Sequence, residues 1–303
     1  MKNKHTLLPF IREDIYGLGP TDIQFFGWEI KIFNIQNCWK KSKGKGVKVG
    51  VIDTGCDLDH PDLKNNIDQG INLVNPKKDP IDDNGHGTHV SGTIAGEDNG
   101  IGMVGVAPLT KILPIKALDA KGSGNNQNIS KGIIWATDNK CNFICMSLGS
   151  PYPSLEIEQA INYATKKGTI VFCAAGNSGE KSDIMYPAKF ENTISIGAID
   201  KNLERASFTC SGEELDFLSP GYDIVSCVPD NSYASMSGTS MSTPFAVGCA
   251  SLLLSYNKQN KLEIPKTPQD YINIFKKNSK NLKNPKYAGI KKYQGYGIIY
   301  PVV

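Results

Sequence analysis

The sequence contains the run Gly46-Val47-Lys48-Val49-Gly50-Val51-Ile52-Asp53-Thr54-Gly55, which is apolar and rich in β-branched side chains before it ends in a carboxylate. Such a run is typical of a strand buried in a parallel sheet. Further apolar runs lie near residues 111–117, 142–147, 169–174 and 194–199, and segments with helical spacing separate them. This alternation predicts an α/β fold, a doubly wound and mostly parallel sheet with helices on both faces.

The 303-residue chain shows no internal repeat and no linker rich in Pro, Gly or Ser between these runs. We therefore expect one globular domain over residues 21–303, preceded by a short extension of residues 1–20. The net charge of +3 is small and gives no indication of nucleic-acid binding. No apolar stretch approaches the roughly 18 residues of a membrane-spanning helix, and residues 1–20 lack the pattern of a secretory signal. We expect a cytoplasmic protein that binds neither nucleic acid nor membrane.

Three polar residues lie at the ends of predicted elements, which is where open α/β sheets carry their sites. Asp53 ends the first strand, and His86 opens a helix of small residues within 84–92. Ser240 lies in Gly238-Thr239-Ser240-Met241, at the start of an apolar run. A serine hydroxyl becomes a useful nucleophile only beside a base, and the base needs a group that orients it. The three residues therefore predict a catalytic triad.

Each of these residues also has a structural interpretation. The run around Ser240 is typical of a turn with a helix cap, and Asp53 could cap a helix or finish a turn. His86 and His89 are three residues apart and could bind a metal or pack as core histidines. The zinc-protease pattern, with a Glu between histidines four residues apart, is absent from the sequence.

The segments 51–55, 86–90 and 238–241 resemble the three signature blocks of the subtilisin-like serine proteases, or subtilases. The resemblance extends from about residue 45 to the C-terminus. It implies a serine endopeptidase that works through an acyl-enzyme, with Asp53 as orienting acid, His86 as base and Ser240 as nucleophile. It also implies that Asn177 donates to the oxyanion. A peptide transferase or cyclase on the same fold, and an inactive peptide-binding module, are the alternatives.

A protein or peptide substrate would pair as an extended strand with exposed strand edges. The resemblance places two such edges at Gly122-Ser123-Gly124 and Ser147-Leu148-Gly149. It also implies that the primary pocket is lined by Leu148, Ala174, Ala175 and Gly176, with Met185 near the floor. No acidic residue occupies these pocket positions, so we expect an apolar residue before the cleaved bond.

The Gly-rich loop 97–105 resembles the calcium loop of the family. Ca²⁺ prefers six or more oxygen ligands, including backbone carbonyls. The resemblance implies a structural calcium ion whose ligands come from Asp62, Glu97, Asn99, Ile101 and Met103. A further ligand is expected from the N-terminal region, where the sequence does not identify it. An ordinary Asn-Gly turn is the alternative to this site.

The motif Leu7-Leu8-Pro9-Phe10 resembles one near the start of the intracellular subtilisins, whose short extension lies over the active site. The resemblance implies a zymogen in which the chain's own N-terminal segment is the inhibitor. Pro9 restricts the backbone and removes a hydrogen-bond donor, so it could keep the segment out of cleavage geometry. A frayed tail with an apolar anchor is the alternative.

The run 295–299 resembles the closing strand of the family.

Overall fold

The computed structural model describes residues 4–15 and 23–303. Within these residues, seven parallel strands form the central sheet in the order β11-β10-β9-β7-β3-β5-β4. In that order their bounds are Phe217–Pro220, Thr193–Ile199, Ile170–Ala174, Phe143–Met146, Lys48–Asp53, Lys111–Lys116 and Ile71–Asn72. All five strands expected from the apolar runs are present, and their parallel pairing confirms the predicted α/β class.

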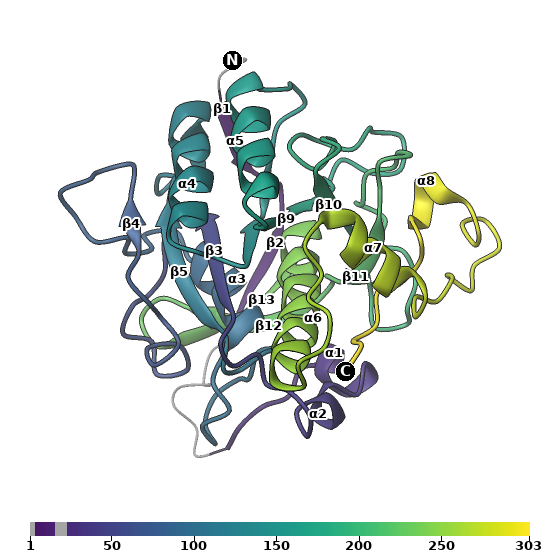
Figure 1. The fold of residues 1–303 in the computed structure, drawn as a ribbon, viewed down its shortest axis with the longest axis horizontal. Coiled ribbons are helices and arrows are strands. Elements are labelled where there is room, and N and C mark those ends of the chain that lie inside the picture. The colour runs from purple at the N-terminus through teal and green to yellow at the C-terminus, as the bar shows by residue number, and fades with distance from the viewer. Residues whose placement is uncertain (1–3, 16–22) are drawn as a thin grey trace.

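Two groups of helices cover the sheet (Figure 1). Helices α4 (Asn126–Asp138) and α5 (Leu155–Lys166) pack side by side, with α4 against β3 and β5. Helices α3 (His86–Ala95) and α6 (Thr239–Gln259) pack against each other, and α6 also contacts β7, β9 and β10. Both α3 and α6 are buried over most of their length. The side chains at their N-terminal ends are therefore held by the core.

The described residues also form four shorter helices. Helices α1 (Trp28–Ile32) and α2 (Ile35–Cys38) precede β3, whereas α7 (Pro268–Lys276) and α8 (Lys291–Gln294) follow α6. The expected strand over 295–299 does not form: only Ile298 makes bridges, with Leu218 and Lys280. Gly295 and Gly297 both have positive φ, which interrupts an extended strand at this point.

Two small sheets include the N-terminal segment. Strand β1 (Lys4–Leu7) lies between β6 (Ser123–Asn125) and β8 (Leu148–Gly149) and is antiparallel to both. Strand β2 (Ile11–Ile15) pairs with β13 (Ser232–Ser237), which also pairs with β12 (Ile224–Val228). Residues 1–3 and 16–20 of the expected extension lie outside the described residues. The part that is described is paired with the domain over almost its whole length.

Among residues 4–15 and 23–303, no helix combines the length and the apolar character that crossing a membrane requires. All eight cysteines are free thiols, and seven of them are buried.

Candidate active site

The first pair of the predicted triad is in contact. Asp53 ends β3, and His86 is the first residue of α3. Nδ1 of His86 lies 2.8 Å and 3.0 Å from the two carboxylate oxygens of Asp53. Because a carboxylate only accepts, Nδ1 donates, and in the neutral ring Nε2 is left with a free lone pair. This is the tautomer that a general base requires.

The turn before α3 places His86 against β3. Gly85 has φ +103°, a conformation that favours glycine. A Cβ on Gly87 would lie 2.1 Å from the Gly55 carbonyl oxygen, so only glycine allows this close approach of α3 to the end of β3. The glycines on each side of His86 therefore have a steric role in forming the site.

Asp82 connects this turn to the end of β3. Its carboxylate accepts hydrogen bonds from Thr54 Oγ1 (2.8 Å) and from the backbone N–H groups of Gly85 and Thr88 (both 2.9 Å). Thr54 Oγ1 accepts in turn from the N–H of Gly87 (3.0 Å). Burial alone would raise the pKa of Asp82, but the hydrogen bonds from the Thr88 hydroxyl and from backbone N–H groups lower it below its usual range. Sequence reasoning missed this positioning residue, although the run 82–88 offered the signal of an Asp just before a helix start.

Ser240 lies in the first turn of α6 and is fully buried. Its hydroxyl donates to the carbonyl of Ser147 (3.2 Å), and the Ser147 hydroxyl donates to the carbonyl of Ser240 (2.8 Å). His86 Nε2 is also buried and has no hydrogen-bond partner among the described residues. Phe10 of the N-terminal segment packs on the His86 ring, with centroids 5.0 Å apart, and its Cβ lies beside Gly238. The segment thus covers both the base and the turn that carries the serine.

Asn177 follows β9 at the position predicted for the oxyanion donor. Its Oδ1 accepts hydrogen bonds from the backbone N–H (2.9 Å) and the hydroxyl (2.7 Å) of Thr239. With Oδ1 occupied in this way, the Nδ2 group is turned toward the cleft, where it donates to the carbonyl oxygen of Pro9 (2.7 Å). Thr239 is a second positioning residue that sequence reasoning missed, although it stands directly before Ser240.

The predicted substrate edges are the strands that hold β1. His5 and Thr6 pair with Gly124 and Ser123 of β6, and Leu7 pairs with Leu148 of β8. The N–H of Leu7 also donates to the carbonyl of Gly122 (2.8 Å). An extended peptide therefore fits between these edges.

Leu8 is only 2% exposed, and its side chain lies beside Gly149 and Met185 of the predicted cleft. A Cβ on Gly149 would lie 2.8 Å from Leu8 Cδ2 and 3.3 Å from Met185 Cβ, so these side chains meet at one glycine. Met185 also packs against Gly176, and its N–H donates to the carbonyl of Ala175 (2.9 Å). Ala174 precedes them at the end of β9 and is buried. The structure thus brings Met185 together with Ala175 and Gly176, and it places Leu8 and Met185 against the same residue, Gly149.

His89 is a packed core histidine, one of the two interpretations left open above. Its Nε2 lies 3.0 Å and 3.2 Å from the carbonyl oxygens of Ile224 and Ala234. Burial lowers the pKa of His89 to about 3, with a smaller effect from His86. Its role is to hold α3 against β12 and β13.

The residues predicted for calcium meet at the loop after α3. Asp62 Oδ2 accepts from the N–H of Met103 (2.8 Å), and Oδ1 accepts from Asn99 Nδ2 (3.1 Å). The Glu97 carboxylate accepts hydrogen bonds from Asn65, so only the backbone carbonyl of Glu97 is directed toward the other predicted residues. That carbonyl accepts from Gln24 Nε2 (2.8 Å). Gln24 thus reaches this loop from the N-terminal region, where the sequence identified no residue for it.

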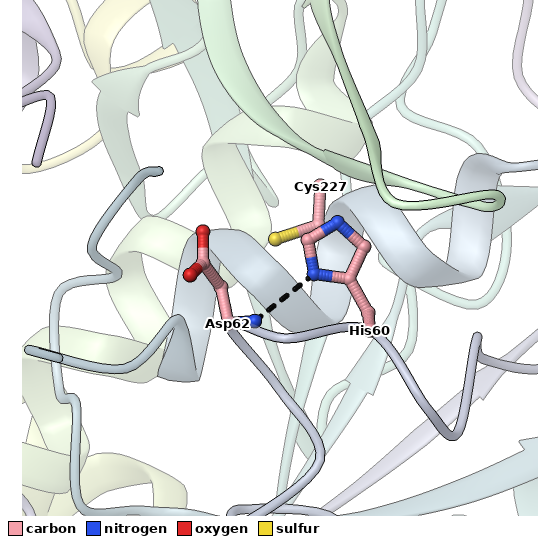
Figure 2. A group of neighbouring side chains, drawn as sticks. All are labelled: His60, Asp62 and Cys227. Atoms are coloured by element: carbon pink, nitrogen blue, oxygen red, sulfur yellow. Dashed lines mark hydrogen bonds between the residues drawn. The ribbon is translucent and has the colours of Figure 1, made fainter. Parts of the chain in front are cut away.

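A second group with metal-ligand side chains comprises His60, Asp62 and Cys227 (Figure 2), whose ligand atoms lie within 4.8 Å of one another. Both nitrogens of His60 have partners: Nδ1 accepts from the N–H of Asp62 (3.2 Å), and Nε2 lies 3.2 Å from the carbonyl oxygen of Ser232. Burial raises the pKa of the Cys227 thiol well above its usual range, so the thiolate form that binds metals is disfavoured. This group is best described as packed interior that supports Asp62.

Comparison with known proteins agrees with this geometry. A model of the subtilase family matches residues 44–297. Subtilisin Savinase of Lederbergia lenta is 47% identical over 214 residues, which are 71% of this chain and 78% of that protein. The chain belongs to the subtilase family. An intracellular serine protease of Paenibacillus polymyxa is 40% identical over 270 residues, 86% of this subtilase and 81% of that protein.

A third relative is longer than this subtilase. The alkaline protease of Shouchella clausii is 47% identical over 214 residues, and the match covers 71% of this chain but only 55% of that protein. The family assignment confirms the predicted enzyme class, a serine endopeptidase that hydrolyses peptide bonds.

Proposed function

We propose that this subtilase is an endopeptidase of the intracellular type, which cleaves protein and peptide substrates after an apolar residue and is inhibited by its own N-terminal segment. The intracellular assignment is supported by the 40% identity to an intracellular serine protease over 86% of the chain. The observation that carries the proposal is the course of residues 4–10, which pass between both predicted substrate edges and reach Asn177.

The proposed chemistry assigns one role to each polar group at the site. The Ser240 hydroxyl rotates away from the Ser147 carbonyl, transfers its proton to His86 Nε2 and attacks the scissile carbonyl carbon. The protonated imidazole then donates to the leaving amine, which departs as the peptide bond breaks and an ester forms on Ser240. Water, deprotonated by His86, attacks the ester and restores the serine. Asp53 orients the imidazole and stabilises its charged form.

The oxyanion requires donors that are already in place before the charge develops. Asn177 Nδ2 is aimed into the cleft because Thr239 occupies the amide oxygen. We assign Asn177 as one donor and the backbone N–H of Ser240 as the other. The Pro9 carbonyl, which Asn177 contacts at 2.7 Å, occupies the position of the scissile carbonyl.

The mismatch between Leu8 and Pro9 explains how the segment would escape cleavage. In a productive complex, the residue that fills the primary pocket also provides the carbonyl that enters the oxyanion hole. We assign Leu8, which is buried beside Gly149 and Met185, to the primary pocket, whereas the carbonyl at Asn177 belongs to Pro9. Pro9 has a restricted φ and no N–H, so the backbone passes the nucleophile displaced by one residue. The segment therefore binds in the manner of an inhibitor.

A structural calcium ion would be held by the loop after α3. The oxygen donors available there are the side chains of Gln24, Asp62 and Asn99 together with the carbonyls of Glu97, Ile101 and Met103. Rotation of the Gln24 and Asn99 amides by 180° would replace their NH₂ groups with oxygens beside Glu97 and Asp62. Six oxygens, one from a carboxylate, suit the hard Ca²⁺ ion. When bound, the ion would neutralise Asp62 and hold the N-terminal region to the loop.

The proposal is tested with casein, a fluorophosphonate that reacts with activated serines, and two matched variants. We expect the full chain to be labelled and to cleave casein only slowly, and Ser240→Ala to do neither. Ser242→Ala is the control, because Ser242 is a buried serine of the same helix whose hydroxyl bonds to Ser219 instead. The proposal fails if Ser240→Ala keeps the activity, or if neither the full chain nor a variant with a weakened segment reacts.

A further inference from the structure

The pocket that receives His5 is polar. His5 lies in β1, three residues before Leu8, and its side chain is 1% exposed. Its Nδ1 lies 2.9 Å from Oδ1 of Asn126, the first residue of α4, which is itself only 8% exposed. The ring Nε2 is buried and has no partner among the described residues. The pocket therefore provides a hydrogen-bond partner, Asn126, for Nδ1 of the imidazole and none for Nε2.

Neutral imidazole suits this pocket and charged imidazole does not. Oδ1 of Asn126 accepts, so Nδ1 of His5 donates and Nε2 carries only a lone pair. Protonation would place a second N–H and a positive charge in a buried site with no acceptor, which is costly. Burial accordingly lowers the pKa of His5, and the hydrogen bond to Asn126 offsets only part of that effect.

The charged residues on the surrounding elements do not compensate for such a charge. Lys4 precedes His5 in β1, Asp119 precedes β6, and Glu156 lies in the first turn of α5. Asp119 accepts from the N–H groups of Lys121 and Ser123. None of these side chains has a hydrogen bond or ion pair to His5 within residues 4–15 and 23–303. Strand β8 offers only Leu148 and Gly149.

An apolar residue in the same pocket would also be disfavoured. It would leave the buried carbonyl of Asn126 without its donor, and an unsatisfied buried acceptor costs more than a formed hydrogen bond contributes. A site built to bond a polar group rejects an analogue that lacks it.

We propose that Asn126 is a specificity-determining residue of the cleft, and that it selects a neutral imidazole three residues before the residue in the primary pocket. The inference rests on the proposed peptidase function and deepens it. Residues 5–8 show the preferred substrate register, His-Thr-Leu-Leu. Asn126 contacts the bound chain far from the reacting atoms, so its effect is on substrate choice.

The test uses the full chain with Leu8→Asp, which places a carboxylate in the apolar pocket and should free the cleft. Its substrates are the p-nitroanilides of X-Thr-Leu-Leu, with X as His, Ala, Leu or Lys. At pH 8 we expect kcat/KM to be about tenfold higher for His than for Ala or Leu, and lowest for Lys. As the pH falls below about 6.5, the advantage of His over Ala should disappear. The ratio of two substrates cancels the titration of the catalytic groups.

Asn126→Leu in the same background should abolish the preference for His and favour Leu at X. Gln127→Leu is the control, because Gln127 is the exposed neighbour on the same turn. Equal cleavage of all four substrates by the Leu8→Asp chain would overturn the inference while leaving the peptidase intact. Cleavage of none of them, without fluorophosphonate labelling, would instead refute the proposed function. The substrate series decides the matter even if Asn126→Leu does not fold.

Discussion

Asn177 Nδ2 donates a 2.7 Å hydrogen bond to the carbonyl oxygen of Pro9, so the group that would stabilise an oxyanion is occupied by the chain's own backbone. The amide can make this contact only in one orientation, which Thr239 imposes through two hydrogen bonds to Oδ1. The orientation of the oxyanion donor and the contact with the N-terminal segment therefore depend on the same pair, Asn177 and Thr239.

Loss of the Asn177 amide should reduce turnover. In the Leu8→Asp background, Asn177→Leu should lower kcat by about 10²–10³-fold with little change in KM, the range measured for loss of the equivalent donor in subtilisin. The measurement is steady-state cleavage of a chromogenic peptide. An unchanged kcat would show that Asn177 only holds the inhibitory segment.

Thr239→Val should have a smaller effect of the same kind. Thr239 does not reach the substrate, but its hydroxyl orients the Asn177 amide and accepts from the N–H of Gly176 (3.2 Å). We expect kcat to fall about tenfold because the donor is less well oriented. Thr243→Val is the matched control, since that hydroxyl donates only to the helix carbonyl of Thr239. Equal losses in the two variants would indicate a general effect on α6.

Release of the segment should increase activity. Leu8→Asp places a carboxylate in an apolar pocket, which opposes closure strongly. We expect peptide cleavage by the full chain to rise at least about tenfold. Ile11→Asp is the control: Ile11 belongs to the same segment, but its side chain is 53% exposed and should tolerate the change. If both variants behave like the unmodified chain, the segment does not limit access to the cleft.

The sequence was sufficient for the fold class because five of the seven central strands are apolar runs between Val47 and Ile199. The two edge strands, β4 and β11, are short and lie outside these runs, so they were not predicted. The triad could be predicted because its residues stand in short glycine-flanked motifs. Gln24 was not predicted, since its partner Glu97 lies in another segment and no local pattern marks it. Asp82 was missed although it stands just before the helix, because its contact with Thr54 depends on how the chain folds. The prediction of a strand over 295–299 was wrong, because Gly295 and Gly297 adopt positive φ angles that an extended strand does not allow.

The inhibited state should be weaker in acid. His5 is buried in the closed state, where its pKa is lowered, whereas in the open state it has its ordinary pKa of about 6.5. Binding of the N-terminal segment in the cleft is therefore strongest above that pH. As the pH falls below it, the equilibrium constant for this binding decreases by up to about tenfold per pH unit. The charged groups around the pocket, Lys4, Asp119 and Glu156, form no ion pair with the ring.

This effect is measured as the activity of the full chain divided by that of Leu8→Asp at each pH. The quotient cancels the titration of the catalytic residues and should rise below about pH 6.5. His5→Gln keeps a polar side chain without a titrating ring and should make the quotient independent of pH in this range. A quotient that is constant with His5 present would contradict the prediction.

Calcium should stabilise the fold through Asp62. At a concentration about 100-fold above its Kd, an ion that binds only the folded state contributes about 2.7 kcal/mol, which corresponds to about 4 °C in Tm for a chain of this length. We expect EGTA to lower the Tm of the full chain by this amount, as followed by circular dichroism. Asp62→Ala removes the loop's carboxylate ligand, so its Tm should no longer respond to EGTA.

Because Asp62 also accepts from Met103 and Tyr233, the variant will be less stable in any case, and the readout is the response to EGTA. Asp59→Ala, at an exposed carboxylate nearby, should keep the full response. If the unmodified chain has the same Tm with calcium and with EGTA, this loop does not bind the ion.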